Sequence, residues 1–496
     1  MPALTAQPVI TYPLKALSLA LAFSPIMHIA SSLAAVVCPT RNTLAPMRPR
    51  PAGLLRLGMV AAALLQLSSA SQAVDFGPFS LNGFAKAEIT RVSNNCPECQ
   101  RFPTEGKDKF WADELVPGTE FKSREVHVTL FQPYLGVKFD LGKGFKLQGL
   151  LSQRWRDGKE DIPGFWYDRN IALTHEDYGS IRIGAMTARA WSVADYPYGT
   201  NIGIADVWGS SGAGYGLMTS AVRYTSRLLD VLEGDLVLEA TYDQGNTGFN
   251  INKPAFVELY AQFHKGDLVV DAMVQDSRNG TPAAWGHGPF TGLTPFAVDD
   301  AKLGGSGQSI AMVMGRYQID SRFEVSGGLR HNRWSGAYAA ITSFANGNAQ
   351  WNNMFNVDWT KDLGGGVYRG YAASSTDVMA GLRYRFGQWV ASTGVAYLGK
   401  ASTDNPTEAG QSNSALINTL GLNYEYAQGL QFYGTAGMVH YGLAAQSSGC
   451  NGQPTRAPGT CSLAPLSMPG NAAFTNVDSR VARNGNWFTI GAVFVF

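Results

Sequence analysis

The sequence predicts an all-β fold, a transmembrane antiparallel β-barrel of sixteen strands. Three observations lead to this fold class: short segments alternate apolar and polar side chains, an even number of them is counted, and the long connections all follow odd-numbered strands. A period of two gives a strand two different faces, and about ten residues suffice for a tilted strand to cross the hydrocarbon core. Short turns are therefore expected at one end of the barrel and long extracellular loops at the other.

The composition agrees with one large β structure. Of 496 residues, 45% are hydrophobic and 11% aromatic, and 56 are glycine, which suits many turns. The 39 Lys and Arg residues almost balance the 38 Asp and Glu residues. A nucleic-acid partner would call for a basic excess, so the class of nucleic-acid-binding proteins is excluded.

The chain begins with segments that are not expected to belong to the barrel. Residues 47–73 start at a methionine, carry arginines before an apolar run, and end in Ser-Gln-Ala, which predicts a signal peptide cleaved after Ala73. Since this signal peptide is complete from Met47, residues 1–46 are interpreted as an upstream extension that is not translated. The barrel domain is then 74–496.

Each strand is predicted from its alternation. In 79–92, Phe79, Leu81 and Ile89 fall on one face, while Lys86 and Glu88 fall on the other. The same reading places strands at 79–92, 123–140, 145–156, 166–177, 181–189, 217–229, 235–244, 254–265, 267–277, 309–320, 322–333, 375–386, 388–399, 414–427, 429–441 and 485–496. Sixteen strands enclose a lumen too wide for side chains to fill.

The connections give the barrel its direction. The long ones follow odd-numbered strands and cover 93–122, 190–216, 278–308, 334–374 and 442–484, whereas several others are tight, such as Gly142-Lys143-Gly144. Both termini are therefore expected at the short-turn end, which is the periplasmic end in such barrels. No run of eighteen apolar residues follows Ala73, so no transmembrane helix is predicted for the mature chain.

Aromatic residues near the strand ends separate this interpretation from a soluble β-sandwich, which would also alternate. Two girdles of such residues flank the lipid band of a membrane barrel. The candidates are Trp155, Tyr167, Tyr224, Tyr242, Phe263, Tyr317, Tyr384, Phe386, Tyr424, Tyr426, Phe488 and Phe496.

The final strand carries a family resemblance. It places Phe488, Ile490 and Phe494 on one face and ends at Phe496. Together with the strand count and the loop pattern over most of 76–496, this ending resembles the general porins of Gram-negative bacteria. The resemblance implies an outer-membrane homotrimer, in contact with lipid and lipopolysaccharide, that allows passive diffusion of small hydrophilic solutes and ions, and it implies that Phe496 is the signal for the barrel-assembly machinery.

The resemblance also implies a constriction. In that family the third external loop folds into the lumen, and its acidic residues face a basic wall. Here the loop contains only two charges, Asp195 and Asp206, and the family's Pro-Glu-Phe-Gly signature is replaced by Tyr196-Pro197-Tyr198-Gly199, without the Glu. Asp195 is the expected substitute, although an Asp in this context is equally typical of a turn.

The basic side of the constriction is predicted from strands 1–3. The inward phase there carries five residues: Lys86, Lys138, Lys146, Arg154 and Arg156. They form one patch in this interpretation; alternatively, each simply solvates the pore wall.

Charges on the inward phase of all strands are nearly balanced. Seven further basic residues are Arg182, Arg223, Arg227, Arg316, Arg330, Arg383 and Arg385, which makes twelve. The eleven acidic residues are Glu88, Asp140, Asp168, Glu176, Glu239, Asp243, Glu258, Asp271, Glu324, Asp377 and Glu425. A difference of one does not predict an ion selectivity.

Four of the five cysteines lie in the mature chain. Cys96 and Cys99 form a C-x-x-C pair, and Cys450 and Cys461 bracket ten residues. Because an exported chain meets an oxidising compartment, two local disulfides are expected, Cys96–Cys99 and Cys450–Cys461. A zinc site is the alternative, but no His lies near either pair, so neither a metal nor a cofactor is predicted.

Three function classes other than a diffusion channel are relevant: an enzyme, a substrate-specific porin, and a surface adhesin or receptor. The sequence lacks H-E-x-x-H, G-x-S-x-G and Walker A motifs, so no enzyme is predicted. A substrate-specific porin remains open, with Trp285, Trp334, Trp351 and Trp359 as a binding track, and so does a surface adhesin or receptor anchored by its barrel.

Overall fold

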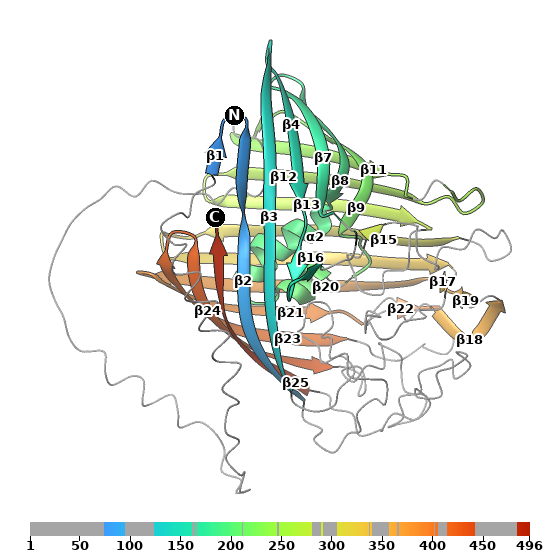
Figure 1. Ribbon diagram of the computed structural model, residues 1–496. Helices are drawn as coiled ribbons and strands as arrows, with labels where there is room; N and C mark the ends of the chain where they lie inside the picture. Colours follow the sequence, from blue (N-terminus) through green and yellow to red (C-terminus); the bar gives the residue numbers. More distant parts are fainter. Residues whose placement is uncertain are drawn as a thin grey trace, which may run out of the picture. The chain divides into compact units, whose positions relative to one another are not determined.

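The barrel wall consists of sixteen strands that pair in sequence order in the computed structural model (Figure 1). They are β2 (Phe79–Asn94), β3 (Arg124–Gly142), β4 (Phe145–Ser152), β7 (Asp168–His175), β8 (Gly179–Thr187), β9 (Leu217–Thr225), β11 (Gly234–Asp243), β12 (Ala255–Lys265), β13 (Leu268–Arg278), β15 (Ser306–Gln318), β16 (Phe323–Gly336), β20 (Ala373–Phe386), β21 (Trp389–Leu398), β23 (Ala415–Ala427), β24 (Leu430–Tyr441) and β25 (Asn484–Val495). Every neighbouring pair is antiparallel, and β25 pairs with β2, which closes the barrel. The predicted fold class and the sixteen strands are confirmed.

The structure describes residues 74–94, 124–160, 164, 166–210, 212–245, 248–279, 289–290, 305–336, 338–339, 357–364, 367–400, 402–404, 414–441 and 484–496. The predicted signal peptide 47–73, the extension 1–46 and the disulfides Cys96–Cys99 and Cys450–Cys461 lie outside these residues and stay predictions.

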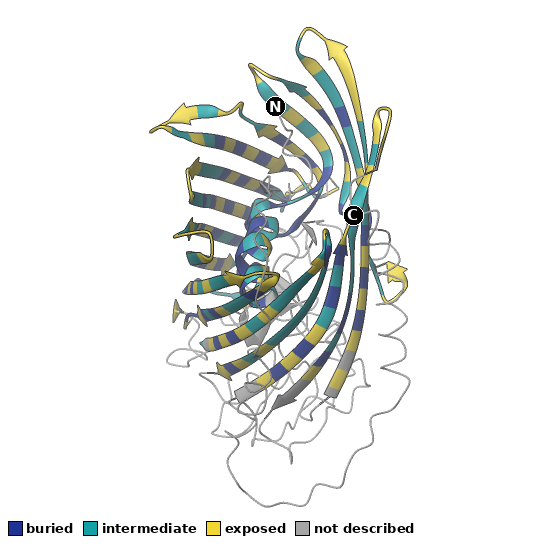
Figure 2. Cartoon of the chain, turned by 90° about the vertical axis from the view of Figure 1, so that its left-hand side faces the viewer, coloured by how far each residue is buried: buried dark blue, intermediate teal, exposed yellow. Residues whose placement is uncertain are grey.

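Alternation along the strands separates two faces (Figure 2). On β11, Val237, Glu239 and Thr241 are buried, whereas Leu238 is 42% and Tyr242 is 49% exposed. The exposed side chains point away from the barrel axis and form an apolar outer surface. An apolar outer surface over polar inner positions is the pattern of a barrel that contacts lipid.

One predicted strand is interrupted. The segment 145–156 forms β4, which ends at Ser152, and the short β5 (Trp155–Arg156), although both pair with β3 in one register. In that register Pro133 of β3 stands opposite Gln153. Since proline has no backbone N–H to donate, the ladder breaks at this position.

Several short elements lie outside the sixteen strands. They are β1 (Val74–Phe76), β6 (Lys159–Glu160), β10 (Leu229–Val231), β14 (Pro289–Phe290), β22 (Ser402–Thr403) and a separate small sheet of β17 (Tyr338–Ala339), β19 (Val367–Gly370) and β18 (Val357–Gly364). The small sheet occupies part of 334–374, which the sequence predicted as irregular loop. In the described part of the chain, no helix is long and apolar enough to span a membrane.

One predicted girdle residue is not at the lipid surface. Tyr167 is 3% exposed and lies under the guanidinium of Arg154, whose Cζ atom is 4.5 Å from the ring centroid. The prediction was wrong because it extended strand alternation back to Tyr167, whereas β7 begins only at Asp168. By contrast, Tyr242, Tyr317 and Phe488 are 47–54% exposed.

The carboxy-terminal residue lies at the seam between β25 and β2. The Phe496 N–H donates to the Gly83 oxygen at 3.0 Å, and the Gly83 N–H donates to the Phe496 oxygen at 2.9 Å. The Phe496 ring stacks on Phe131 of β3, with centroids 6.2 Å apart, and on Phe494 at 5.8 Å. The last residue therefore contributes both hydrogen bonds and ring contacts to barrel closure.

Candidate functional site

The connection between β8 and β9 lies inside the barrel (Figures 1 and 2). It contains α2 (Arg189–Val193), the π-helical turn η2 (Ala194–Gly199) and α3 (Ala205–Ser210). We call residues 188–216 the lumen loop. The sequence predicted an inward fold for this Gly-rich, almost uncharged segment, and the contacts below agree with it.

Apolar packing holds the lumen loop against one side of the wall. Its buried residues include Val193, Tyr198, Ile202, Ile204, Val207 and Trp208. They pack in one cluster with inward side chains of β12 to β25, including Met273, Ile310, Met312, Met314, Trp334, Met379, Ala396, Ile417, Val439 and Trp487. The hydrophobic effect favours the covering of these apolar wall residues by the loop over their exposure to a water-filled lumen.

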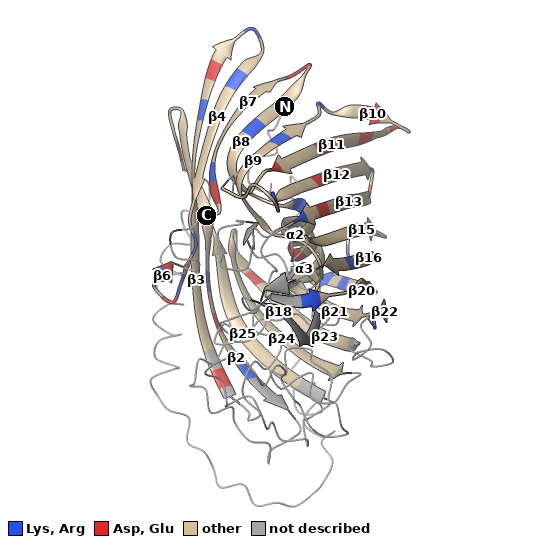
Figure 3. Ribbon diagram, turned by 90° about the vertical axis from the view of Figure 1, so that its right-hand side faces the viewer, with Lys and Arg blue, Asp and Glu red and all other residues tan. Residues whose placement is uncertain are grey.

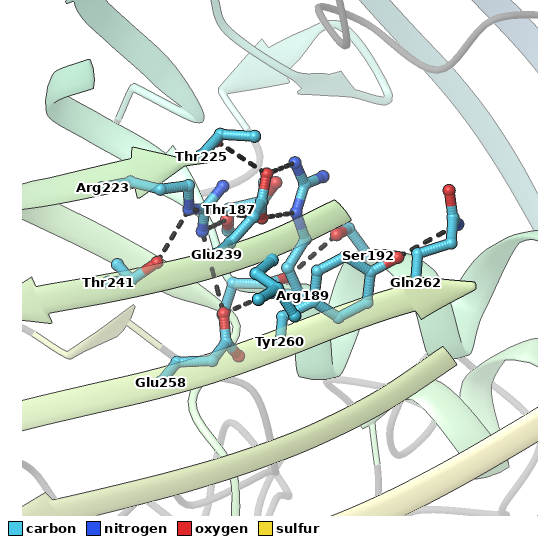
Figure 4. Close-up of polar contacts among 12 residues, drawn as sticks. Thr187, Arg189, Ser192, Arg223, Thr225, Glu239, Thr241, Glu258, Tyr260 and Gln262 are labelled. Carbon is cyan, nitrogen blue, oxygen red and sulfur yellow. Dashed lines mark hydrogen bonds and ion pairs between the residues drawn. The ribbon is translucent and has the colours of Figure 1, made fainter. Parts of the chain in front are cut away.

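The first polar anchor lies where the loop enters the lumen (Figure 4). Arg189 donates to both carboxylate oxygens of Glu239, at 2.5 and 2.8 Å, and the backbone N–H groups of Arg189 and Ala190 donate to Glu258 at 2.8 and 3.0 Å. Arg223 lies 3.8 Å from Glu239 and 3.7 Å from Glu258. Burial alone would lower the pKa of Arg189, but the Glu239 carboxylate, together with Tyr260 and Glu258, raises this pKa above its ordinary value.

The second anchor joins Tyr198 to β13. The Tyr198 hydroxyl donates to Asp271 at 2.7 Å, and the Tyr260 hydroxyl donates to the other oxygen of Asp271 at 2.5 Å. Burial and the neighbouring Asp271 both raise the pKa of Tyr198. Tyr198 is only 1% exposed, so it fixes the loop to the wall and its ring does not border open lumen.

The third anchor joins the end of α3 to β16. Arg330 donates to the Trp208 carbonyl oxygen at 2.6 Å and pairs with Asp377, and Asn332 accepts from the Ala213 N–H at 3.0 Å. Gly212 has a φ of 102°, and a Cβ atom there would lie 2.5 Å from the Asn332 side-chain oxygen. Glycine is therefore required at residue 212 for this close approach.

Replacing Asp377 by Ala is expected to lower the unfolding free energy by about 3–5 kcal/mol, because it leaves the fully buried Arg330 without its carboxylate. Asp377 also accepts from Asn332 and from the Gly399 N–H. The shift is measured as a lower unfolding temperature in detergent micelles.

The matched control for this substitution is Glu425→Gln. Glu425 pairs with Arg385 at 2.5 Å on the same barrel, but the two side chains are 34% and 44% exposed, so the change should cost less than about 1 kcal/mol. Equal destabilisation by both variants would contradict the view that the Arg330–Asp377 pair is an anchor of the lumen loop.

Four of the predicted basic residues lie on strands of one wall, Lys86 on β2, Lys138 on β3, Lys146 on β4 and Arg156 on β5, and Arg154 lies between β4 and β5. Figure 3 shows blue segments along this wall. Lys86 and Arg156 are the register partners of Leu130 on its two sides, and Lys86 pairs with Glu88 at 3.2 Å. Lys138 and Lys146 lie farther along β3 and β4, near the turn at 142–144. The five residues therefore extend along the wall, and they do not all meet at one level.

Arg154 lies next to the lumen loop. Arg154 donates to Gln132 at 2.8 Å, and its Cζ atom lies 5.4 Å from the centroid of the Trp191 ring, which belongs to the lumen loop. Arg154 and Asp195 both interact electrostatically with Tyr134 of β3. Asp195 also accepts from the Thr200 hydroxyl at 3.5 Å.

The structure says less about Tyr196 and Asp206, the two other predicted residues of the loop. Tyr196 is 40% exposed. Asp206 belongs to α3, but its side chain is outside the described residues. The predicted opposition of the loop acids Asp195 and Asp206 to the basic residues of the wall stays a prediction.

Sequence reasoning missed several residues of this site. Tyr134, Tyr167 and Trp191 surround Arg154, and Arg189 enters the first anchor. The sequence predicted that Asp168 and Arg182 face inward, but it did not include them among the residues of the constriction. No signal in the sequence connects Arg189 with Glu239, because the partners are 50 residues apart.

In the described part of the chain, no group of three His, Cys, Asp or Glu side chains is placed to hold a metal ion. The site consists of a loop packed inside the barrel and held to the wall by charged and polar side chains.

A closed sixteen-stranded barrel with a lumen loop packed on its inner wall is the architecture of bacterial porins. No family model and no curated protein matches the chain. Among solved structures, the chain is similar to an anion-selective porin from Comamonas acidovorans, with a TM-score of 0.51 and 12% identity over 84% of this chain and 99% of that one. That likeness supports the porin fold.

Two further structures match with lower scores. OmpT, an outer-membrane protein of Vibrio cholerae, has a TM-score of 0.47 and 12% identity over 86% of this chain and 100% of that one. The outer membrane channel DcaP of Acinetobacter baumannii has a TM-score of 0.46 and 13% identity over 84% of this chain and 97% of that one.

Proposed function

We propose that the chain forms a water-filled channel for passive diffusion of small hydrophilic solutes and ions across the outer membrane of a Gram-negative bacterium. The observation that carries this proposal is a closed barrel with an apolar outer face, accessible charges on its inner face and a loop packed within the lumen. Sixteen strands leave an aqueous lumen, and the lumen loop, which packs mainly against the wall formed by β12 to β25, narrows it.

The proposal includes the assembly of the mature chain 74–496 as a homotrimer. The trimer follows from the resemblance to general porins, as do the contacts with lipopolysaccharide and the barrel-assembly machinery. Crosslinking of the purified protein, followed by mass determination, tests the oligomeric state independently of conduction.

Planar-bilayer recording tests the channel directly. Purified protein is expected to produce discrete conductance steps that grow linearly with salt concentration. A folded protein without conductance would favour an adhesin or receptor anchored by its barrel. Phospholipid hydrolysis by the same preparation would favour an enzyme.

A substrate-specific porin is the second candidate, and one contact favours it. Arg154 lies over the neighbouring rings of Tyr167 and Trp191, and a cation with aromatic rings beside it is an arrangement suited to retain a solute. Of the four tryptophans predicted to form a binding track, Trp334 is 2% exposed beneath the lumen loop, and the side chains of Trp285, Trp351 and Trp359 are outside the described residues. Saturable, solute-blocked conductance would support this candidate.

Replacing Lys86 and Arg154 together by Glu is expected to shift the reversal potential in a salt gradient toward that of cations. Lys86 lies on β2, and Arg154 precedes β5 and lies beside Trp191 of the lumen loop, where a narrowed lumen would focus the field of wall charges. The same two residues changed to Gln provide the control and should give a smaller shift in the same direction. An unchanged reversal potential in the Glu variant would place both residues away from the ion path.

A further inference from the structure

Acidic side chains on the inward face of the barrel are buried more often than basic ones. Among the described side chains, the buried charged residues are two basic ones, Arg223 and Arg330, and six acidic ones, Glu88, Glu239, Asp243, Glu258, Asp271 and Asp377. All eight belong to the inward face that the sequence assigned. The near balance of twelve basic and eleven acidic residues on the inward face therefore differs from the balance of charges that are accessible to a solute in the lumen.

Four of the buried acids are paired with cations. Glu239 and Glu258 lie within 3.8 Å of Arg223, and Glu239 also pairs with Arg189 at 2.5 Å. Asp377 pairs with Arg330 at 2.6 Å. Glu88 pairs with Lys86 at 3.2 Å, as described above, and accepts from a tyrosine hydroxyl at 2.6 Å. A partner at such short range cancels most of the field of each carboxylate farther away.

The other two buried acids are surrounded by neutral donors. Asp271 accepts from the hydroxyls of Tyr198 and Tyr260 under the lumen loop. Asp243 accepts from the backbone N–H groups of Thr219 and Ser220, both at 3.0 Å, and from that of residue 245 at 2.7 Å. Both carboxylates are thus held by donors of the protein, and they are covered from the lumen.

The accessible charges that remain are mainly basic. Taking two buried residues from twelve and six from eleven leaves ten basic against five acidic residues. The ten are Lys86, Lys138, Lys146, Arg154, Arg156, Arg182, Arg227, Arg316, Arg383 and Arg385, and the five are Asp140, Asp168, Glu176, Glu324 and Glu425. Four of the ten, Lys86, Arg316, Arg383 and Arg385, pair with Glu88, Glu324 or Glu425 at 2.5–3.9 Å, so most of their field is cancelled in the same way. The six other basic residues then stand against Asp140, Asp168 and Glu176.

We propose that the lumen selects small anions, because folding buries its acidic residues and leaves the basic ones in contact with water. This inference rests on the proposed function and adds the class of solute. Accessible charges of one sign on low-dielectric walls raise the local concentration of the opposite ion. Chloride and small carboxylate- or phosphate-bearing solutes should therefore pass more readily than cations of equal size.

The test is the reversal potential in a potassium chloride gradient across a planar bilayer, measured for the full mature protein. The wild type is expected to be more permeable to chloride than to potassium. Lys138→Gln, which removes an accessible positive charge, should lower the chloride-to-potassium permeability ratio. Glu425→Gln, which removes an accessible negative charge, should raise it.

Asp243→Asn is the matched control for burial. It removes a negative charge from the same inward face as Glu425→Gln does, and it keeps an amide oxygen as acceptor. Because Asp243 is fully buried, the permeability ratio should not change. If this variant does not fold, the wild-type sign and the Lys138→Gln shift still decide the question, since neither needs a buried substitution.

The outcomes separate the two proposals. Conductance with a preference for potassium, or an Asp243→Asn shift as large as that of Glu425→Gln, would overturn anion selection and leave the channel intact. Absence of conductance from folded wild-type protein would overturn the channel itself.

Discussion

Deletion of residues 197–212 is expected to raise the single-channel conductance severalfold and to admit larger solutes. These residues include Tyr198, Ile202 and Trp208, which pack on the inner wall, and the barrel strands make their own closed hydrogen-bond ladder without them. Conductance of an aqueous pore rises with its free cross-section, so removal of material from the lumen should widen the passage. Single-channel recording and liposome swelling with sugars of graded size measure the two effects.

A matched variant for the deletion is Tyr198→Phe. It removes only the hydrogen bond to Asp271 and keeps the buried ring, so conductance should stay close to that of the wild type. The shift in electrophoretic migration on heating establishes that both variants are folded. Unchanged conductance in a folded deletion variant would mean that the lumen loop does not limit the passage.

Removal of Phe496 is expected to cause a severe loss of assembled protein in the outer membrane. The deletion removes two backbone hydrogen bonds with Gly83, each contributing about 1 kcal/mol, and the ring contact with Phe131. It also removes the terminal aromatic residue that the resemblance to general porins identifies as the assembly signal. The yield of heat-modifiable barrel in isolated outer membranes is the measurement.

Two substitutions at this residue separate the contributions. Phe496→Tyr keeps the ring and the backbone, and it should assemble like the wild type. Phe496→Ala keeps the backbone hydrogen bonds but loses the ring, so its yield should lie between those of the wild type and the deletion. Normal yield of the deletion variant would show that neither the ring nor the seam bonds are needed.

Strands and faces were predictable because alternation is a local property. A reader of 235–244 obtains β11 and its inward residues Glu239 and Asp243 directly from the sequence. The break in 145–156 was not predictable in this way, because it arises from Pro133 on the neighbouring strand, and the register between strands is not a local property.

The candidate site was predictable only in part. An inward loop with Asp195 and a wall with Arg154 followed from residue types and resemblance, but the partners of the anchors did not. Nothing near Arg330 in the sequence indicates Trp208, which is 122 residues away. Burial of the inward acids was missed for the same reason, since the lumen loop that covers some of them and the strands that hold them are distant in the chain.

The lumen loop contacts strands that lie far along the chain, which bears on the order in which the barrel assembles. Ile202 accepts a hydrogen bond from Thr419 of β23, a residue 217 positions later, and the same apolar cluster includes Trp487 of the final strand. Contacts between such distant residues form late, because the intervening chain must first be organised. The lumen loop therefore reaches its final place only when the last strands are in place, so the width of the lumen depends on strands that enter the barrel long after the loop itself.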